Sequence, residues 1–195
     1  MPERAASRRL ARAISLVAHP FVVPAASALW ATLRRGAAPA ELLLLAALLG
    51  VLVTAVAAYS WQRVRSGRWQ DIDASRRAER RELNRFAFVL VGAAALFVIV
   101  VLRRPIFGLP LATAAAMLLV CLVTGRWLKL SHHVMFAVLP AGWLWPDGRA
   151  LLAIAVLAAA VGWSRRRLGR HDLPEIVGGA ALGAFGAAVV ACGLD

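Results

Sequence analysis

Two short polar segments interrupt the apolar second half of the chain, and each carries histidine next to basic side chains. The first covers residues 129–133 and the second covers residues 164–175. Charged groups at the boundary of an apolar helix are costly to place there, so they usually mark a functional site. Two imidazoles, several fixed positive charges and a hydroxyl are the groups that phosphoryl transfer needs. The two segments therefore predict a phosphoryl-transfer site.

The spacing of the residues in these segments is more informative than their composition. Ser164 to Glu175 reads S-R-x5-H-x3-E, and Lys129 to His133 reads K-x-S-x-H. In this order the patterns resemble the third and second motifs of the type 2 phosphatidic acid phosphatase superfamily, a family of integral-membrane lipid phosphatases. The family's third motif is S-R-x5-H-x3-D, and its second is P-S-G-H or a looser S-x-H. The resemblance covers roughly residue 62 to the C-terminus.

The resemblance implies a mechanism with a covalent phosphohistidine intermediate. His171 is the implied nucleophile, and Glu175 is the implied partner that holds its imidazole tautomer. His133 is the implied general acid for the leaving lipid alkoxide and then the base for water. This scheme needs no metal ion and no other cofactor. Asp172 is adjacent to His171, but helix residues four apart face each other and adjacent ones do not, which favours Glu175 as the partner.

Fixed positive charges contribute most of the catalysis in such a site, because charge lies on the phosphoryl oxygens. The resemblance implies that the phosphate is held by Lys129, Ser131, Ser164 and Arg165. The family's first motif, K-x6-R-P, is absent, and an arginine-rich stretch at residues 71–81 stands in its place. On a helix, Arg77 and Arg81 lie on one face and can supply the missing cations. Arg76 and Arg80 form the same kind of pair, and the sequence does not choose between them.

Two further departures from the family pattern lie inside the motifs. Glu175 replaces the usual aspartate, and a small backbone shift can absorb its additional methylene group. His132 stands where the second motif has glycine, and its bulk either crowds the phosphate or adds a hydrogen-bond donor.

The rest of the chain must hold these residues in place, and its composition is that of a membrane protein. Of its 195 residues 61% are hydrophobic, and the mean hydropathy is +0.71. The candidate spans are residues 13–33, 41–61, 86–102, 106–125, 133–145, 151–163 and 176–194. Because a span needs about 20 mostly apolar residues, we expect an all-α polytopic bundle of about six or seven transmembrane helices. We expect one domain over residues 1–195, with its motif-bearing core at about 62–195.

The order of polar and apolar segments predicts a topology. Two candidate spans separate the basic segment 62–85 from residues 129–133, and two more separate those from residues 164–175. An even number of spans returns the chain to the same side, so the three polar segments are expected at one face. Lys and Arg are concentrated there, and the positive-inside rule makes this face cytoplasmic. The expected location is the inner or plasma membrane of a bacterial-type cell.

The net charge of +13 indicates the kind of partner. The arginines lie between apolar blocks and no nucleic-acid-binding motif is present, so we expect anionic lipid headgroups or phosphate substrates and no nucleic acid. Phosphatidic acid, phosphatidylglycerol phosphate and polyprenyl phosphates all fit this description. The sequence does not choose among these substrates and does not indicate an oligomeric state.

Two other functions fit parts of the sequence. Asp71 and Asp73 are paired carboxylates that can hold magnesium against a pyrophosphate, as in an intramembrane prenyltransferase or phosphotransferase. Such enzymes usually have two aspartate-rich segments, and the sequence has one. The other alternative is a catalytically inactive membrane protein that binds lipid, and the two histidines in motif positions argue against it.

Overall fold

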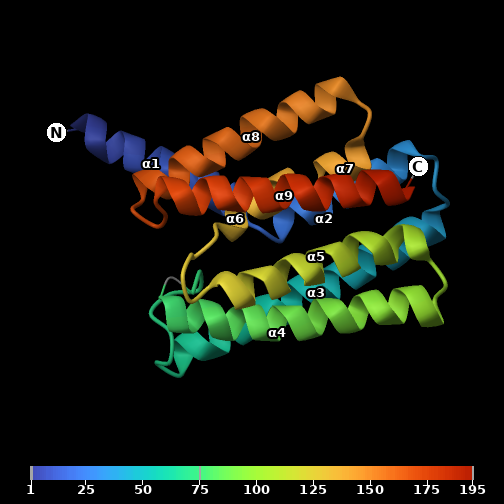
Figure 1. Cartoon of the computed structure of the whole chain (residues 1–195), viewed down its shortest axis with the longest axis horizontal. Helices are drawn as coiled ribbons and strands as arrows, with labels where there is room; N and C mark the ends of the chain where they lie inside the picture. The colour runs from blue at the N-terminus through green and yellow to red at the C-terminus, as the bar shows by residue number, and fades with distance from the viewer. Residues whose placement is uncertain (1, 75, 195) are drawn as a thin grey trace. The chain divides into compact units, whose positions relative to one another are not determined.

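Five segments of the structure are long and apolar enough to cross a membrane (Figure 1). In the computed structural model, which describes residues 2–74 and 76–194, they are α3 (Pro39–Arg65), α4 with its π-helical continuation η1 (Arg77–Leu96 and Phe97–Val101), α5 (Pro105–Thr124), α8 (Gly148–Arg167) and α9 (Leu173–Leu194). The described residues include no strand. The predicted all-α polytopic helix bundle is therefore confirmed, and the protein is an integral membrane protein.

The N-terminal segment forms two helices joined at a bend instead of one straight span. α1 (Pro2–Val17) and α2 (Val22–Arg34) are separated by a short break and meet at 51°. Pro20 lies in this break. Proline interrupts a helix because it has no backbone N–H to donate and its ring clashes with the preceding turn. If the bent pair is counted as one broken span, the number of spans rises to six.

The candidate span at residues 133–145 has a different structure from the one expected. It forms two short helices, α6 (His132–Val138) and α7 (Ala141–Leu144), on either side of Pro140. Neither is long enough to cross a membrane, and nearly all of α6 is buried. Hydropathy does not separate a lipid-facing span from a short buried segment, because both are apolar. The described residues give six spans, the lower of the two expected numbers, only when the bent α1–α2 pair is counted as one span, and five when it is not.

The chain divides into two compact units. The first unit comprises Met1–Gly36 and Leu130–Asp195, and the second unit comprises Ala37–Lys129. The expected single domain over residues 1–195 stays a prediction.

In the second unit, α3, α4 and α5 run back and forth, and α4 packs against both neighbours (Figure 1). Gly108 at the start of α5 lies so close to Ile99 that a Cβ would overlap the isoleucine side chain, so glycine permits this approach. The loop between α3 and α4 is fixed by the first turn of α4. There Glu79 accepts hydrogen bonds from the backbone N–H groups of Gln70 and Arg76 at 2.9 and 3.3 Å.

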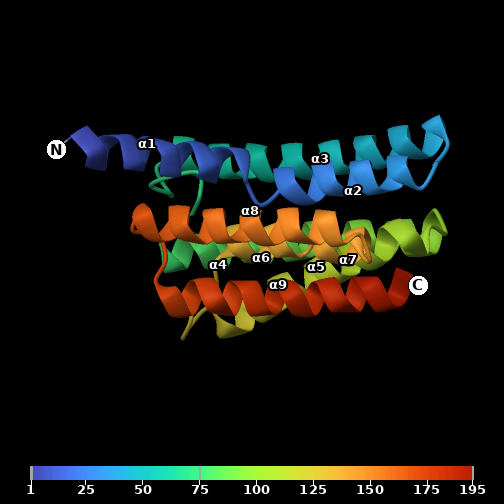
Figure 2. The ribbon, with the colours of Figure 1, turned by 90° about the horizontal axis from the view of Figure 1, so that it is seen from above.

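In the first unit, α8 packs against α1 and α6, and α9 packs against α6 and α7 (Figure 2). Two glycines of α9 allow it to approach the α6 backbone. A Cβ on Gly179 would lie 2.7 Å from the Ser131 carbonyl oxygen, and one on Gly183 would lie 2.6 Å from that of Met135. Glycine at both positions therefore lets the first half of α9 lie directly against α6 and its N-cap residue.

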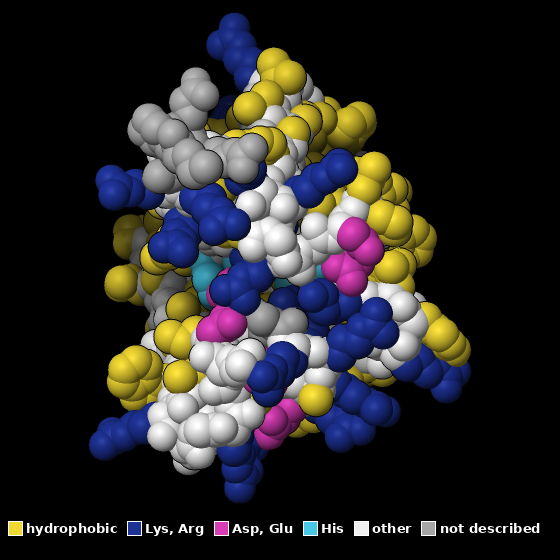
Figure 3. Space-filling view, turned by 90° about the vertical axis from the view of Figure 1, so that its left-hand side faces the viewer, with side chains coloured by type: hydrophobic (Ala, Val, Ile, Leu, Met, Phe, Trp, Pro, Cys, Tyr) yellow, Lys and Arg dark blue, Asp and Glu magenta, His cyan; other side chains and the backbone are white. Residues whose placement is uncertain are grey.

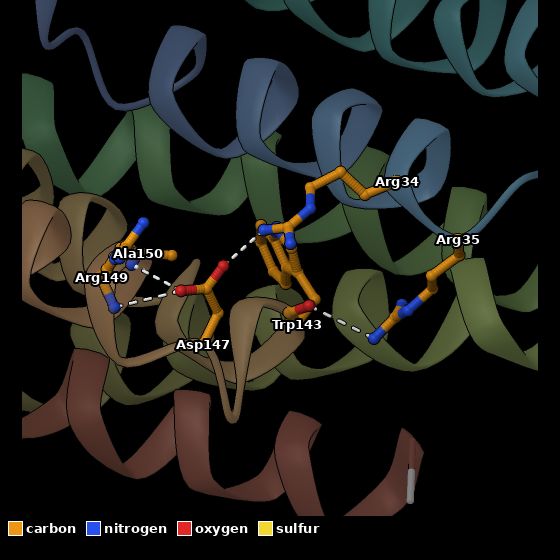
Figure 4. Close-up of polar contacts among 6 residues, drawn as sticks. All are labelled: Arg34, Arg35, Trp143, Asp147, Arg149 and Ala150. Carbon is orange, nitrogen blue, oxygen red and sulfur yellow. Dashed lines mark hydrogen bonds and ion pairs between the residues drawn. The ribbon is translucent and has the colours of Figure 1, made fainter.

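Polar contacts hold the end of the first unit at which α2 ends and α8 begins (Figure 4). Arg34 forms an ion pair with Asp147, and Arg35 donates to the Trp143 carbonyl oxygen at 3.2 Å. Asp147 is also the N-cap of α8, since its Oδ1 accepts from two backbone N–H groups in the first turn at 3.0 and 3.2 Å. The hydrogen bond from Arg34, followed by those from the helix backbone, holds the pKa of the Asp147 carboxyl below its usual range.

Candidate active site

His171 lies in the loop between α8 and α9, four residues before Glu175 in the first turn of α9. Asp172 is the residue before α9, and its Oδ1 accepts from the Glu175 N–H at 3.0 Å, as an N-cap does. The His171 Nδ1 and Glu175 Oε2 atoms are 2.7 Å apart, and the His171 side chain is fully buried. The structure thus pairs His171 with Glu175, whereas Asp172 caps the helix.

This pair sets the direction of the imidazole ring. A carboxylate oxygen accepts a hydrogen bond, so the tautomer that fits is the one in which Nδ1 donates to Glu175. Nε2, the ring nitrogen that does not bond to Glu175, then has the lone pair that a nucleophile requires. The same carboxylate stabilises the positive charge that the ring acquires when Nε2 forms a bond.

The start of α6 lies against the first turn of α9. Ser131 is the N-cap residue of α6, and its backbone N–H donates to the Glu175 carbonyl oxygen at 3.0 Å. The Ser131 side chain is fully buried, and its hydroxyl has no hydrogen-bond partner among residues 2–74 and 76–194. A buried polar group left in this way costs about 1–3 kcal/mol, so it calls for an explanation such as a bound ligand.

Two buried histidines follow Ser131 in α6, and their rings face different neighbours. The ring of His133 meets that of His19 edge to face, with centroids 5.6 Å apart and planes at 75°. His19 lies in the break between α1 and α2. The ring of His132 instead lies near Phe136 in its own helix, with 6.4 Å between centroids. The histidine that matches the motif is therefore the one in contact with the α1–α2 connection.

Ser164 and Arg165 lie in the last turn of α8, and both side chains are almost completely buried. The Ser164 hydroxyl donates to the Ala11 carbonyl oxygen at 2.6 Å. The Arg165 Nη1 atom donates to the Ser15 hydroxyl oxygen at 2.8 Å. Ser164 and Arg165, the two residues of the third motif that the resemblance implied as phosphate ligands, are therefore both hydrogen-bonded to α1.

Sequence reasoning did not identify Ser15 or His19 as residues of this site. Ser15 contacts a residue 150 positions away along the chain, and no local pattern predicts such a contact. One signal was present, because Ser15 and His19 are polar residues four apart in an otherwise apolar segment. A helix places such residues on one face, and polar groups within membrane segments usually face a protein partner.

The cations expected to replace the first motif belong to the second unit. Arg77 and Arg81 are exposed near the start of α4, and Arg77 Nη1 donates to the Arg126 carbonyl oxygen at 3.3 Å. Arg126 follows the end of α5 and lies three residues before Lys129. Within this unit, the two helices between the arginine-rich segment and Lys129 thus return the chain to the same end, as the topology predicted.

Arg80, from the alternative pair of cations, has a different set of contacts. Its side chain is buried, with Nε donating to the Ala74 carbonyl oxygen and Nη2 to that of Asp73, both at 3.2 Å. These bonds hold the loop before α4. They leave Arg77 and Arg81 as the pair with exposed side chains.

Lys and Arg predominate among the charged side chains on the face of the molecule shown in Figure 3. Basic side chains attract anionic ligands. Within the described part of the chain, no three His, Cys, Asp or Glu side chains gather closely enough to hold a metal ion. Asp71 and Asp73, the carboxylates of the alternative magnesium site, are both partly exposed.

The residues of the third motif and Ser131, His132 and His133 of the second therefore gather in the first unit, where α1, α6, α8 and α9 meet. Function must be inferred from this geometry and from the motifs themselves. No protein-family model matches the chain, and no curated protein or solved structure matches it.

Proposed function

We propose that the protein is a membrane lipid phosphatase of the type 2 phosphatidic acid phosphatase superfamily. The observation that carries this proposal is the buried hydrogen bond between His171 and Glu175. The backbone of Ser131, at the start of α6, is hydrogen-bonded to the Glu175 carbonyl oxygen and so lies beside this pair. An imidazole oriented by a carboxylate is the arrangement of an activated nucleophile. The proposed reaction is hydrolysis of a phosphate monoester, or of a pyrophosphate, on a phospholipid or polyprenyl carrier.

The proposed reaction has two steps. His171 Nε2 attacks phosphorus and forms a P–N bond, the bond from phosphorus to the lipid oxygen breaks, and His133 donates a proton to that oxygen. Water then attacks the phosphohistidine, His133 takes a proton from the water, and the P–N bond breaks to release inorganic phosphate. Glu175 holds the ring in the same orientation through both steps.

Positive charge is proposed to hold the phosphoryl group during both steps. Arg165 is almost completely withdrawn from water, where a cation interacts with an anion more strongly than at the surface. The buried Ser131 hydroxyl is the proposed second contact. The Ser164 hydroxyl donates its hydrogen bond to α1, so the proposed contribution of Ser164 is to fix the position of the neighbouring Arg165.

The proposed substrate keeps its apolar tail among the membrane helices while its headgroup meets the basic site. Phosphatidic acid, phosphatidylglycerol phosphate and polyprenyl phosphates fit this description. The positive-inside rule supports a cytoplasmic site, in the inner or plasma membrane of a bacterial-type cell.

The test is phosphate release by purified protein in detergent from a panel of these lipid phosphates, first in EDTA and then in magnesium. We expect activity that survives EDTA and is abolished in His171→Ala. The matched control is Asp147→Asn, which changes a polar side chain at the end of the first unit where α8 begins, outside the proposed site. A phosphohistidine has a P–N bond that breaks in acid and survives in alkali, so the reaction is quenched in alkali, and the phosphorylated protein should be present in wild type and absent from His171→Ala.

Two results contradict the proposal and identify its alternatives. Activity that requires magnesium and survives His171→Ala assigns the chemistry to Asp71 and Asp73, as expected for a prenyl- or phosphotransferase. Binding of lipid phosphates without turnover of any member of the panel identifies a catalytically inactive lipid-binding protein.

A further inference from the structure

One face of α1 contacts α8 through three hydrogen bonds spaced one helical turn apart. The Arg167 Nε atom donates to the Ser7 hydroxyl oxygen at 2.9 Å. The next two contacts join Ala11 to Ser164 and Ser15 to Arg165, at 2.6 and 2.8 Å. Residues four apart lie on one face of a helix, so these contacts form a single row along α1.

The row becomes more deeply buried toward the third motif. Ser7 is half-buried and its partner Arg167 is exposed. Ser15 is 9% exposed and Arg165 is 1% exposed. Four residues after Ser15, in the connection that follows α1, His19 lies against His133. α1 therefore contacts the proposed phosphate-binding cation, and the α1–α2 connection contacts the proposed general acid.

The contact with Ser15 suits an arginine that must remain positively charged and fixed. A hydroxyl oxygen accepts a hydrogen bond without neutralising the guanidinium, whereas a carboxylate in its place would cancel the charge that phosphate requires. The guanidinium is planar, so one fixed Nη1 bond restricts the directions in which its other N–H groups point. A long side chain held in this way loses less freedom when it binds a phosphoryl group.

We propose that α1 is part of the active site, with Ser15 as a positioning residue that orients Arg165 toward the phosphoryl group. This inference rests on the proposed lipid phosphatase function. Ser15 touches neither the substrate nor His171 in this proposal, and it acts on the reaction only through the Arg165 guanidinium. The N-terminal helix, which carries none of the family motifs, is then required for full activity.

The experiment compares Ser15→Ala and Ser15→Thr with the wild type, and uses Ser7→Ala as the matched control. Ser7→Ala removes the corresponding hydroxyl from the same face, at a bond that lies outside the proposed site. We measure kcat and KM with the lipid phosphate that the wild type hydrolyses fastest, and thermal unfolding in detergent. Ser15→Ala should lower kcat about tenfold with little change in KM, because a misplaced catalytic group loses transition-state contacts. Ser15→Thr keeps the acceptor oxygen and should restore most of the rate, and Ser7→Ala should match the wild type.

A wild-type rate in Ser15→Ala, or an equal loss in Ser7→Ala, overturns the positioning role. A higher rate in Ser15→Ala also overturns it, because the hydroxyl would then compete with phosphate for Arg165. If Ser15→Ala does not fold, Ser15→Cys replaces it, since sulfur has similar bulk but is a weak acceptor, and the same loss is expected. Wild-type protein that is inactive on every lipid phosphate removes the proposed function itself, whereas active wild type with an unaffected Ser15→Ala removes only this inference.

Discussion

Two buried arginines, one in each unit, have different kinds of partner. Arg80 is 6% exposed and donates to the carbonyl oxygens of Asp73 and Ala74, in the loop that precedes its own helix. Arg165 is 1% exposed and donates to the hydroxyl of Ser15, which lies 150 positions away along the chain. Removing either cation from water has a large cost, and the contacts of each must offset it.

The difference lies in what each set of contacts achieves. Arg80 donates to two neutral carbonyl groups of the loop before its own helix, and these bonds hold that loop. The Arg165 side chain is hydrogen-bonded to α1, which is distant along the chain. The Arg165 carbonyl oxygen accepts from the Arg170 N–H at 3.0 Å, in the turn that leads to His171. A buried cation held by long-range contacts near titratable side chains is typical of a functional site. A buried cation held by local carbonyl groups is typical of a fold-stabilising one.

Replacing Arg165 by alanine should give the largest effect and tests the functional half of this comparison. Loss of one preorganised donor to the transition state typically lowers kcat about a hundredfold to a thousandfold, or about 3–4 kcal/mol. Arg165→Lys keeps the charge but loses the planar fork, so it should recover only part of the rate. The measurement is kcat on a lipid phosphate that the wild type hydrolyses. If kcat falls by less than about tenfold, Arg165 only stabilises the packing of α8 against α1, and it then has the same structural kind of role as Arg80.

Replacing Arg80 by alanine should lower the stability of the fold and leave the catalytic rate unchanged. Its two hydrogen bonds come from a charged group, and each such bond contributes about 1.5–3 kcal/mol, so we expect a clear fall in the unfolding temperature in detergent. The kcat of the folded fraction should stay close to that of the wild type. Loss of activity at an unchanged unfolding temperature would contradict this role. It would favour Arg76 and Arg80 over Arg77 and Arg81 as the cations that replace the first motif.

The difference between the two arginines also explains how much of the site the sequence could predict. The pairing of His171 with Glu175 follows from i to i+4 spacing, because both residues belong to one local segment. The contact of Ser15 with Arg165 depends on how α1 packs against α8, and the spacing of neither segment contains that information. Motif reasoning therefore finds residues that act within one segment and misses those brought in by packing.

The fold was predictable to a similar degree. Hydropathy identified the five long helices, because a span requires a long apolar run whatever its neighbours are. It failed at residues 133–145, where burial beneath α8 and α9 makes a short segment as apolar as a span. Length did not separate this segment from a true span, because the candidate at residues 151–163 is equally short and yet lies within α8. Both are shorter than the about 17 residues that crossing the hydrocarbon core requires.

The smallest effect is expected for a third arginine, Arg34, which extends the comparison to an exposed cation. Its partner Asp147 carries a pKa held below the usual range, chiefly by the hydrogen bond from Arg34. A depressed carboxyl pKa stabilises the folded state above the carboxyl's ordinary pKa, and this stabilisation disappears as the pH falls through the lower, folded-state value. The ion pair is exposed and screened by salt, so its contribution should be slight.

Asp147→Asn separates the charge from the cap, because asparagine caps a helix about as well as aspartate and carries no charge. The unfolding temperature of Asp147→Asn should lie slightly below that of the wild type near neutral pH. The gap should close in acid, at pH values below the ordinary carboxyl pKa of 3.8, where the wild-type carboxylate also becomes protonated. Asp147→Ala loses the cap as well, and its deficit should persist in acid. A gap for Asp147→Asn that stays constant through the acid range would show that the charge of Asp147 contributes nothing. Exposed Arg34 would then be a partner without energetic effect, in contrast to both buried arginines.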